Sequence, residues 1–427
     1  MSLSKRATNV LSHGSSSLLW EVTANQWHAE SNPSGFVSLG MAENTLSQDD
    51  LIERIARVPP ISPWTLTYGD GTTGSHRLRT VLAAFFDKYF HAWQTVQAEH
   101  IMVTNGCSAA LEHIFWALGD EQDCFLVTRP FFRAFIPTAE LRIRCNLVEA
   151  GCGGLDPFEP GVVKEYEKTI LRARETGRNV RGILICNPHN PLGRCYPVET
   201  LIGLMELCHR YDLHLISDEV YALSTWENTF DDETATTLFT SCLSIDTSGI
   251  LSQRQIHVVW GVSKDFGSNG IRLGALVSQA SPEMHKSLVP GALYSMVSSL
   301  ADHVYANILA DFTWVDAYLA KNSMALQENY NIVADWARAN KIRFAPGANA
   351  GFFLWVQLGQ VYSDNHPGLD LPDVEGHLMQ LLLESKVFVA PGKSFGAEEM
   401  GWFRIVFSID RVNLFEGLER IVAVLRV

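Results

Sequence analysis

The chain has 427 residues, 47% of them hydrophobic and 19% charged, so it can bury a large core in one or two domains. A formal net charge of −14 argues against binding to nucleic acid or to an anionic membrane surface, because phosphate groups are held by clustered Lys and Arg. Eight scattered cysteines without a CxxC pair, no signal-peptide pattern and no apolar run of about 18 residues predict an intracellular, cytoplasmic protein with reduced thiols. No pattern of metal ligands is visible, so we predict no metal site.

The first forty residues are rich in Ser and Asn and predict an arm rather than a domain. They end in the turn LGMAENTL, residues 39–46, which leads into a helix. Glu43 in this turn is interpreted either as an acid placed near the start of that helix, where the helix dipole favours it, or as a substrate contact.

The stretch TYGDGTTGSHRLR, residues 67–79, has three glycines in six residues and is followed by a helical pattern through Phe90. Such glycines allow a close backbone approach to a ligand at the start of a helix. The stretch lacks the GxxxxGK[ST] and strand-led GxGxxG patterns of nucleotide loops. Tyr68 is therefore either a ligand contact or a packed aromatic residue.

From about residue 100, continuous apolar runs alternate with helical segments, which predicts an α/β fold with a mostly parallel sheet covered by helices on both faces. In such sheets ligands bind beyond the carboxyl ends of the strands. The predicted strands are Ile101–Thr104, Cys124–Thr128, Gly182–Cys186, Leu213–Ser217, His257–Trp260 and Leu273–Ser278. The predicted helices lie around Ala109–Leu118, Lys164–Arg174 and Thr200–Arg210.

Polar and aromatic residues come after the first two of these strands. Cys107 and Ser108 begin a helix and would offer backbone N–H groups to an anion, although Ser108 could equally be an ordinary N-cap. Phe132, in the loop RPFFRAF after the second strand, could lie flat on a planar ligand or belong to an aromatic core.

The next two strands end in the segments NPHNPLG and SDEVY. Two prolines hold Asn190 rigidly, with an amide that can donate to an anionic oxygen. Asp218 stands at a buried strand end, where a carboxylate is costly without a cationic partner, and Tyr221 comes three residues later. A protonated ring nitrogen would be such a partner, and the alternative is a structural N-cap.

The segment VVWGVSKDFGSNGIRLGALVSQ, residues 258–279, places Lys264 on a turn directly after a buried strand. Burial disfavours the ammonium form, so the neutral amine needed for a Schiff base becomes accessible. Arg272 has the fork geometry that suits a phosphate. A lysine and a phosphate-binding arginine are the minimum pair for holding pyridoxal phosphate.

Residues 282–340 are rich in helical patterns and predict a link between two parts of the chain, after which shorter strands and helices mix. The segments NAGFFLW, residues 349–355, and VAPGKSF, residues 389–395, predict a strand and a turn. Arg404 lies inside the apolar strand GWFRIVFS, residues 401–408. A buried arginine needs an anion, which either a substrate carboxylate or a distant Asp or Glu could supply.

In this order, Tyr68, GCSAALE, NPHNPLG, SDEVY, SKDFGSNGIRLG and GWFRIVFS resemble the fold-type I pyridoxal-phosphate enzymes over residues 38 to 408. Within that superfamily the chain most resembles 1-aminocyclopropane-1-carboxylate synthase and the fungal synthase-like proteins, which include carbon–sulfur lyases of secondary metabolism. The resemblance implies a large cofactor-binding domain at 65–305, a smaller α+β domain at 306–427, and an arm with part of the small domain at 1–64.

The resemblance also implies roles for the residues above. It makes Lys264 the Schiff-base lysine and Asp218 the partner of the ring nitrogen, with Asn190 and Tyr221 on the ring oxygen. It assigns Arg404 to the substrate α-carboxylate, Phe132 to ring stacking, and Glu43 to substrate selection. The phosphate is assigned to Cys107, Ser108, Arg272 and, across a homodimer interface, Tyr68, which is also catalytic in the synthases.

The chain departs from the family pattern at three positions. Gly261 stands where the family has Ser, so a phosphate donor is missing or comes from Ser263. Phe132 replaces a tyrosine, and the glycine-rich stretch after Tyr68 replaces the plant sequence. Three functions remain open: a carbon–sulfur lyase acting on S-adenosylmethionine or a cysteine S-conjugate, an aminotransferase, and a non-catalytic regulator that binds the cofactor.

Overall fold

A computed structural model describes residues 3–12, 17–230, 236–369 and 371–426. Its centre is a seven-stranded sheet with the strand order β2-β8-β7-β6-β5-β3-β4. Only β8 runs antiparallel to its neighbours β2 and β7, so the sheet is mixed but mostly parallel, as predicted. The strands are β2 (Ile101–Thr104), β3 (Cys124–Thr128), β4 (Asn146–Ala150), β5 (Val180–Cys186), β6 (His214–Asp218), β7 (Ile256–Gly261) and β8 (Gly274–Val277).

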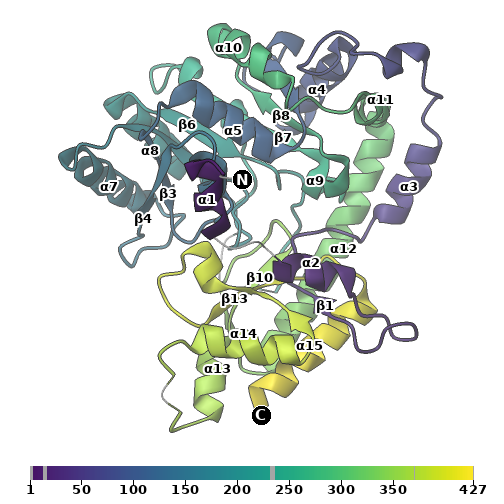
Figure 1. Ribbon diagram of the computed structural model, residues 1–427, viewed down its shortest axis with the longest axis vertical. Helices are drawn as coiled ribbons and strands as arrows, with labels where there is room; N and C mark the ends of the chain where they lie inside the picture. Colours follow the sequence, from purple (N-terminus) through teal and green to yellow (C-terminus); the bar gives the residue numbers. More distant parts are fainter. Residues whose placement is uncertain (1–2, 13–16, 231–235, 370, 427) are drawn as a thin grey trace.

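Helices cover both faces of this sheet, because successive strand residues point to opposite faces and nearly all of them are apolar and buried (Figure 1). One core contains α4 (His76–Tyr89), α7 (Val163–Glu175), α8 (Val198–Tyr211) and α11 (Ser299–Ile308). The other contains α5 (Cys107–Leu118), α6 (Phe135–Glu140) and α10 (Pro282–Ala292). The architecture is therefore the predicted α/β fold, with a mostly parallel central sheet and helices on both faces.

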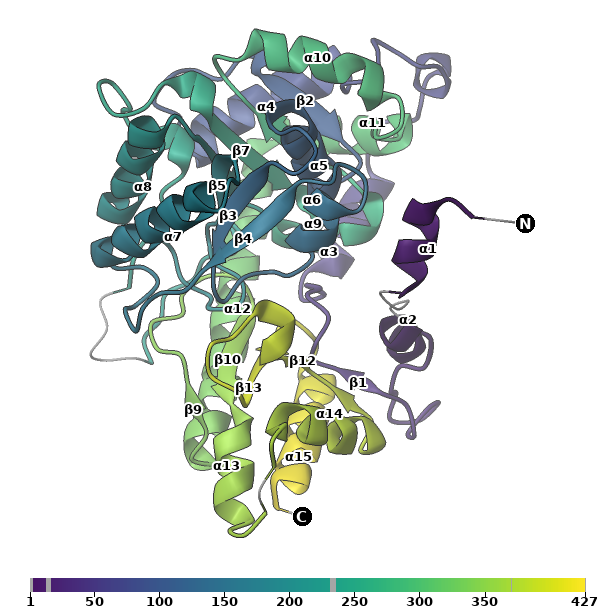
Figure 2. The same ribbon diagram turned by 60° about the vertical axis from the view of Figure 1, so that its left-hand side comes forward.

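The C-terminal part of the chain forms a four-stranded antiparallel sheet of order β12-β13-β10-β9. The 28-residue helix α12 (Phe312–Ala339) runs from the large sheet to this part (Figures 1 and 2). The other elements here are β9 (Arg343–Phe344), β10 (Phe353–Gln357), α13 (Leu358–Asn365), α14 (Val374–Glu384), β11 (Val387–Phe388), β12 (Ala390–Pro391), β13 (Trp402–Val406) and α15 (Arg411–Arg426). The predicted domain boundaries at 64/65 and 305/306 stay predictions.

The N-terminal residues do not form a separate domain. Helices α1 (Lys5–Ser12) and α2 (Ser17–Ala24) precede β1 (Val37–Ser38), which pairs in parallel with β11. The chain then continues into α3 (Gln48–Ala56), where the Arg54 guanidinium pairs with the Asp311 carboxylate at 2.9 Å. Part of the predicted arm, residues 1–2 and 13–16, lies outside the described residues. The connector between β1 and α3, residues 39–47, thus passes from the small sheet to the large part of the molecule.

Some predicted elements need correction. The strand β4 was not predicted, because its residues NLVEA are mostly half-buried and two of them are polar. The predicted strand at 349–355 begins only at Phe353, after a bend at Gly351 and Phe352. Ala350, before this bend, forms an isolated bridge to Thr225. Asp218 is the last residue of β6 rather than the first residue after it.

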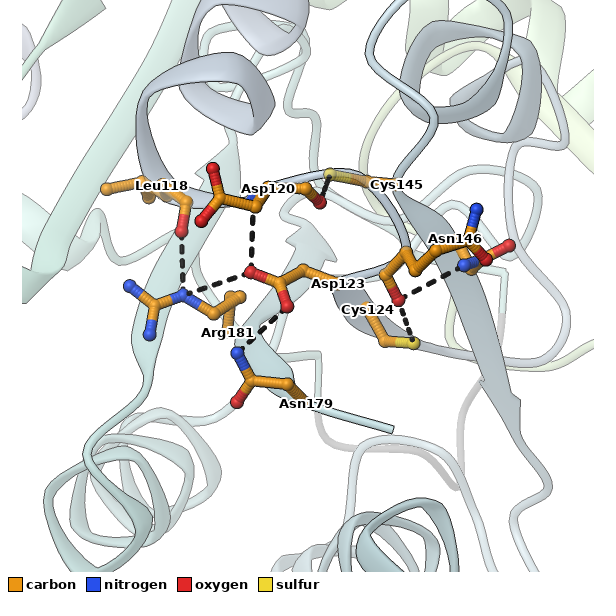
Figure 3. Close-up of polar contacts among 9 residues, drawn as sticks. Leu118, Asp120, Asp123, Cys124, Cys145, Asn146, Asn179 and Arg181 are labelled. Carbon is orange, nitrogen blue, oxygen red and sulfur yellow. Dashed lines mark hydrogen bonds and ion pairs between the residues drawn. The ribbon is translucent and has the colours of Figure 1, made fainter. Parts of the chain in front are cut away.

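A polar cluster fixes the amino ends of β3, β4 and β5 (Figure 3). The Asp123 carboxylate accepts hydrogen bonds from the backbone N–H of Asp120 at 3.0 Å and the amide of Asn179 at 2.9 Å. The guanidinium of Arg181 lies 3.8 Å from the same carboxylate and donates to the Leu118 carbonyl at 2.7 Å. These contacts join the amino ends of the strands, whereas ligands of such sheets bind at the opposite, carboxyl end.

Among the described helices, none combines the length and the apolar character that crossing a bilayer requires. All eight cysteines are free.

Candidate active site

A cavity of about 160 Å³ lies at the carboxyl ends of the central strands. Its wall comes from the loops after β2, β3, β5, β6 and β7, as expected for a parallel sheet. Nine of the residues singled out in the sequence line it together: Cys107, Ser108, Phe132, Asn190, Asp218, Tyr221, Ser263, Lys264 and Arg272.

Lys264 belongs to the short helix α9 (Val262–Asp265), which comes directly after β7. Its side chain is partly buried, and its ammonium donates to the Ala42 carbonyl at 2.5 Å. Burial, and to a lesser extent the Arg404 charge, lowers the pKa of Lys264 to about 8, whereas Glu43 opposes the shift. A substantial fraction of this amine is therefore neutral near physiological pH, as nucleophilic attack requires.

Asp265, the neighbour of Lys264, fixes the turn on which the lysine stands. Its buried carboxylate accepts from the indole N–H of Trp260 at 2.8 Å and from the Ser224 hydroxyl at 2.7 Å. A third hydrogen bond comes from the Leu223 backbone at 3.1 Å. Trp260 belongs to β7, and Leu223 and Ser224 belong to the loop after β6. These hydrogen bonds therefore fix α9 to both strands.

Asp218 points into the cavity from the end of β6. The carboxylate is buried, and the backbone N–H of Val220 at 3.3 Å is the hydrogen bond it receives from the described residues. Burial raises the pKa of Asp218 to about 7, and the Lys264 charge opposes that shift. A cation beside this carboxylate would restore its ionised form, so the site is suited to a positively charged ring nitrogen.

Arg404 connects the small sheet to the cavity. It lies in β13, is buried, and donates to the Asn190 side-chain oxygen at 2.9 Å and the Gly40 carbonyl at 2.7 Å. Burial lowers its pKa to about 10, and its buried Nε has no partner among the described residues. Both of these acceptors are uncharged, so among the described residues Arg404 does not form the salt bridge to a distant Asp or Glu that was the predicted alternative. Asn190 also donates toward the Tyr221 hydroxyl, at 3.5 Å.

The start of α5 offers the cavity free backbone donors. The N-cap is Gly106, with φ of 104°, so Cys107 and Ser108 are the first two helical residues and the ordinary N-cap interpretation of Ser108 is wrong. N–H groups at these two positions have no carbonyl within the helix and carry the positive end of its dipole. Arg272 lies beside Gly106, where a side chain would collide with its guanidinium, and it donates to the Asn269 carbonyl at 2.7 Å.

Packing explains why glycine stands at position 261. A Cβ there would lie 2.8 Å from the Cys107 sulfur and 2.7 Å from the Leu273 carbonyl oxygen. Serine therefore does not fit while Cys107 and Leu273 stay in place. Ser263 is buried and lines the cavity, so it is the hydroxyl in this turn that can reach a ligand.

Of three further predicted site residues, one lines the Lys264 cavity, one lies beside it and one lies elsewhere on the chain. Tyr68 is 75% exposed and lines another cavity of about 430 Å³ with Trp64 and Arg77, so one chain does not bring it to Lys264. Phe132 lines the Lys264 cavity with its ring edge-on to Phe135, at a centroid distance of 5.6 Å. Glu43 lies beside the cavity, where its carboxylate accepts from the Asn269 amide at 2.7 Å.

The sequence did not reveal several lining residues. Asn269 lies inside the quoted motif SKDFGSNGIRLG, so its place near Lys264 could have been inferred, but its contact with Glu43 could not. The others are spread over several segments and carry no chemical signature: Ala42, Leu111, Ala134, Phe135, Thr138, Cys186 and Val220.

Comparisons with protein families, with individual proteins and with solved structures all point to aminotransferases and synthase-like proteins. The family model "Aminotransferase class I and II" matches residues 38–421. A probable aminotransferase, gliI, of Aspergillus fumigatus is 34% identical over 397 residues, covering 90% of this chain and 88% of its own. A human "probable inactive 1-aminocyclopropane-1-carboxylate synthase-like protein 2" is 31% identical over 411 residues, covering 94% of this chain and 69% of its own. Among solved structures, an aspartate aminotransferase mutant of Thermus thermophilus shares the fold, with a TM-score of 0.74, 21% identity, and coverage of 99% of this chain and 100% of its own.

Proposed function

Because the chain belongs to the aminotransferase class I and II family, whose members depend on pyridoxal phosphate, we propose that it is a carbon–sulfur lyase acting on an α-amino acid. The substrate would be S-adenosylmethionine or a cysteine S-conjugate of fungal secondary metabolism. Pyridoxal 5′-phosphate is the cofactor, and the cavity around Lys264 is its proposed site.

The residues of the cavity fit this cofactor. Asp218 is a buried carboxylate in need of a cation, which suits the pyridinium nitrogen. The first N–H groups of α5 and the guanidinium of Arg272 form a cradle for a phosphate, and Gly106 keeps the space for that guanidinium free. Tyr221 and Asn190 would donate to the ring oxygen, and Phe132 would cover one face of the ring.

Bound pyridoxal phosphate supplies an aldehyde that takes up the substrate amino group and a ring that withdraws electrons from the substrate Cα. Lys264 can provide the neutral amine for attachment because burial lowers its pKa to about 8. When the substrate amino group has replaced Lys264 on the cofactor, the free amine of Lys264 would accept the Cα proton and could return it to another atom of the substrate or the cofactor. Arg404 would bind the α-carboxylate with its fork, and the Nε that lacks a partner among the described residues is available for this contact.

The proposal of a thioether or sulfonium substrate rests on the side chains that form the cavity wall. Beyond the cofactor residues, the wall is formed by uncharged side chains, most of them small or apolar: Ala42, Leu111, Ala134, Phe135, Thr138, Cys186, Val220 and Asn269. Among the described residues that line the cavity, Lys264 and Arg272 are the cations, and both are needed for the cofactor. With Arg404 used for the α-carboxylate, no further cation is left here for an acidic side chain. This argues against a negatively charged substrate side chain and is compatible with a cysteine thioether or with the sulfonium of S-adenosylmethionine.

An aminotransferase is the second candidate, favoured by the similarity to the Aspergillus protein, a probable aminotransferase. It would use the same residues, because both reactions begin with loss of the Cα proton. The two reactions differ in their next step: an aminotransferase returns the proton to the cofactor, whereas a lyase expels a sulfur leaving group from Cβ or Cγ.

A product assay tests the proposed function. Each substrate is offered to the cofactor-loaded protein without a keto acid, and aminocyclopropane carboxylate, pyruvate, ammonia and free thiol are measured. We expect either aminocyclopropane carboxylate from S-adenosylmethionine or pyruvate, ammonia and thiol from a cysteine conjugate. Turnover that needs an added keto acid, with the amino group recovered on that acid, would replace the lyase by the aminotransferase.

We also propose a homodimer with shared active sites, because Tyr68 lies exposed on the surface of one chain. Its neighbours Trp64 and Leu66 are exposed as well, which suits a surface that another subunit covers. Mixing inactive Lys264→Ala with inactive Tyr68→Phe chains should restore activity, since one site of each heterodimer would be intact. If isolated heterodimers stay as inactive as both parents, each site is built from one chain.

A further inference from the structure

Asn269 is a residue of the cavity to which neither the sequence nor the proposed function gives a role. It begins the turn Asn269–Ile271 shortly after Lys264, and it lines the cavity. Its side-chain amide donates to Glu43 Oε1 at 2.7 Å. Its backbone carbonyl accepts from Arg272 at 2.7 Å, so a change of the Asn269 side chain leaves that second contact in place.

Glu43 comes from the connector between β1 and α3, which is tied to the site at several points. The carbonyl of Ala42, the preceding residue, accepts from the Lys264 ammonium at 2.5 Å. The Glu43 carbonyl accepts from the Ser408 hydroxyl at 2.6 Å, and Gln48, the first residue of α3 directly after the connector, donates to the Gly267 carbonyl at 3.1 Å. These contacts hold the backbone of the connector, whereas the amide of Asn269 holds the carboxylate itself.

We propose that Asn269 is a positioning residue, whose amide fixes the Glu43 carboxylate beside Lys264 so that this carboxylate controls the charge of the lysine. An amide is suited to this task because it donates to one carboxylate oxygen without neutralising the charge. A carboxylate that is free to turn toward water would interact with Lys264 through a higher dielectric and would therefore act more weakly. The inference concerns the same site as the proposed function, but it holds for a lyase and an aminotransferase alike.

Several groups around Lys264 shift its pKa, and Glu43 opposes those that lower it. Burial and the cations Arg404 and Arg272 lower the pKa of the lysine, whereas Glu43 and Cys107 raise it. Asp218 faces Lys264 from the end of β6. Losing the fixed Glu43 charge must then lower the pKa further, because a negative neighbour favours the ammonium form.

The test measures the charge of Lys264 directly, in full-length protein freed of cofactor. An amine-selective acylating reagent labels the protein over a range of pH, and mass spectrometry quantifies the label on Lys264. In the wild type, half-maximal reactivity is expected near pH 8. In Asn269→Ala the midpoint should fall by about 0.5–1 pH unit, with Glu43→Gln falling at least as far. Asn269→Gln, which keeps an amide, should restore part of the difference.

Two further variants make the result decisive. The double variant Asn269→Ala/Glu43→Gln should fall no further than Glu43→Gln alone, since Asn269 is proposed to act only through that carboxylate. Gln48→Ala loosens the end of the connector, where it enters α3, without changing a charge near Lys264, so its midpoint should stay at the wild-type value. An unchanged midpoint in Asn269→Ala, additive effects in the double variant, or an equal fall in Gln48→Ala would overturn the proposal. Retained binding of pyridoxal phosphate on reloading shows that each variant is folded, and the product assay of the proposed function is independent of all these outcomes.

Discussion

Replacing Lys264 by alanine is expected to abolish covalent attachment of pyridoxal phosphate and to reduce turnover by about 10²–10⁴-fold or more. The expectation rests on the position of the amine in the cavity and on its lowered pKa of about 8. The measurement is borohydride reduction of the loaded protein and then peptide mass spectrometry. In the wild type, the phosphopyridoxyl label should lie on the peptide that contains Lys264.

The matched control is Lys286→Ala, which removes an exposed lysine of α10. It should keep both the label on Lys264 and the activity. A label that persists in Lys264→Ala at wild-type stoichiometry, on whichever other lysine, would refute the assignment of the Schiff-base residue. The readout is covalent, so it does not depend on knowing the substrate.

Arg404→Ala should raise the KM for the amino-acid substrate by about 30- to 1,000-fold while leaving cofactor binding nearly unchanged. Losing a contact that is charged on both sides costs on the order of 2–4 kcal/mol, which corresponds to that range. Arg404 does not line the described cavity itself and reaches it through Asn190, at 2.9 Å. The phosphate is assigned to Arg272 and the start of α5, so most cofactor contacts should survive the loss of Arg404. Steady-state kinetics and a cofactor titration by absorbance measure the two quantities separately.

Two variants sharpen this prediction. Arg404→Lys keeps the charge but not the fork, and should recover only part of the affinity for substrate. Arg411→Ala removes a surface arginine that pairs with Glu328, and it should change neither quantity. An unchanged KM in Arg404→Ala would move the carboxylate anchor to another residue. An equal loss of cofactor affinity would instead mean that Arg404 supports the fold of the site.

The fold was predictable because the strands of the central sheet are buried on both faces. Such strands appear in the sequence as continuous apolar runs. The last residue of each predicted strand in this sheet lies within about one position of the last residue of the observed strand. The edge strand β4 was missed for the opposite reason: Asn146 and Glu149 are only partly buried, and the apolar run is interrupted. A half-exposed edge strand such as β4 needs less apolar surface, so its sequence identifies it poorly, whereas the other edge strand, β2, is buried and was predicted.

The site was predictable where a local pattern implies a chemical need. A lysine after a buried strand, a lone carboxylate at a strand end and an arginine within an apolar strand each call for a specific partner, and the structure brings Lys264, Asp218 and Arg404 into one region. Contacts between distant segments leave no such pattern. The hydrogen bond between Glu43 and Asn269, 226 positions apart, and the exposed position of Tyr68 could be found only from the structure.

The connector between β1 and α3 also has a consequence for the order of folding. The carbonyl of Gly40 meets Arg404 across 364 positions, and that of Ala42 meets Lys264 across 222. Contacts between such distant positions form late, because the intervening chain must first be ordered. During synthesis, residues 39–47 leave the ribosome long before either partner exists, so the chain must be nearly complete before the contacts around Lys264 can form. A refolding assay that monitors cofactor capture should therefore lag behind one that monitors helix content.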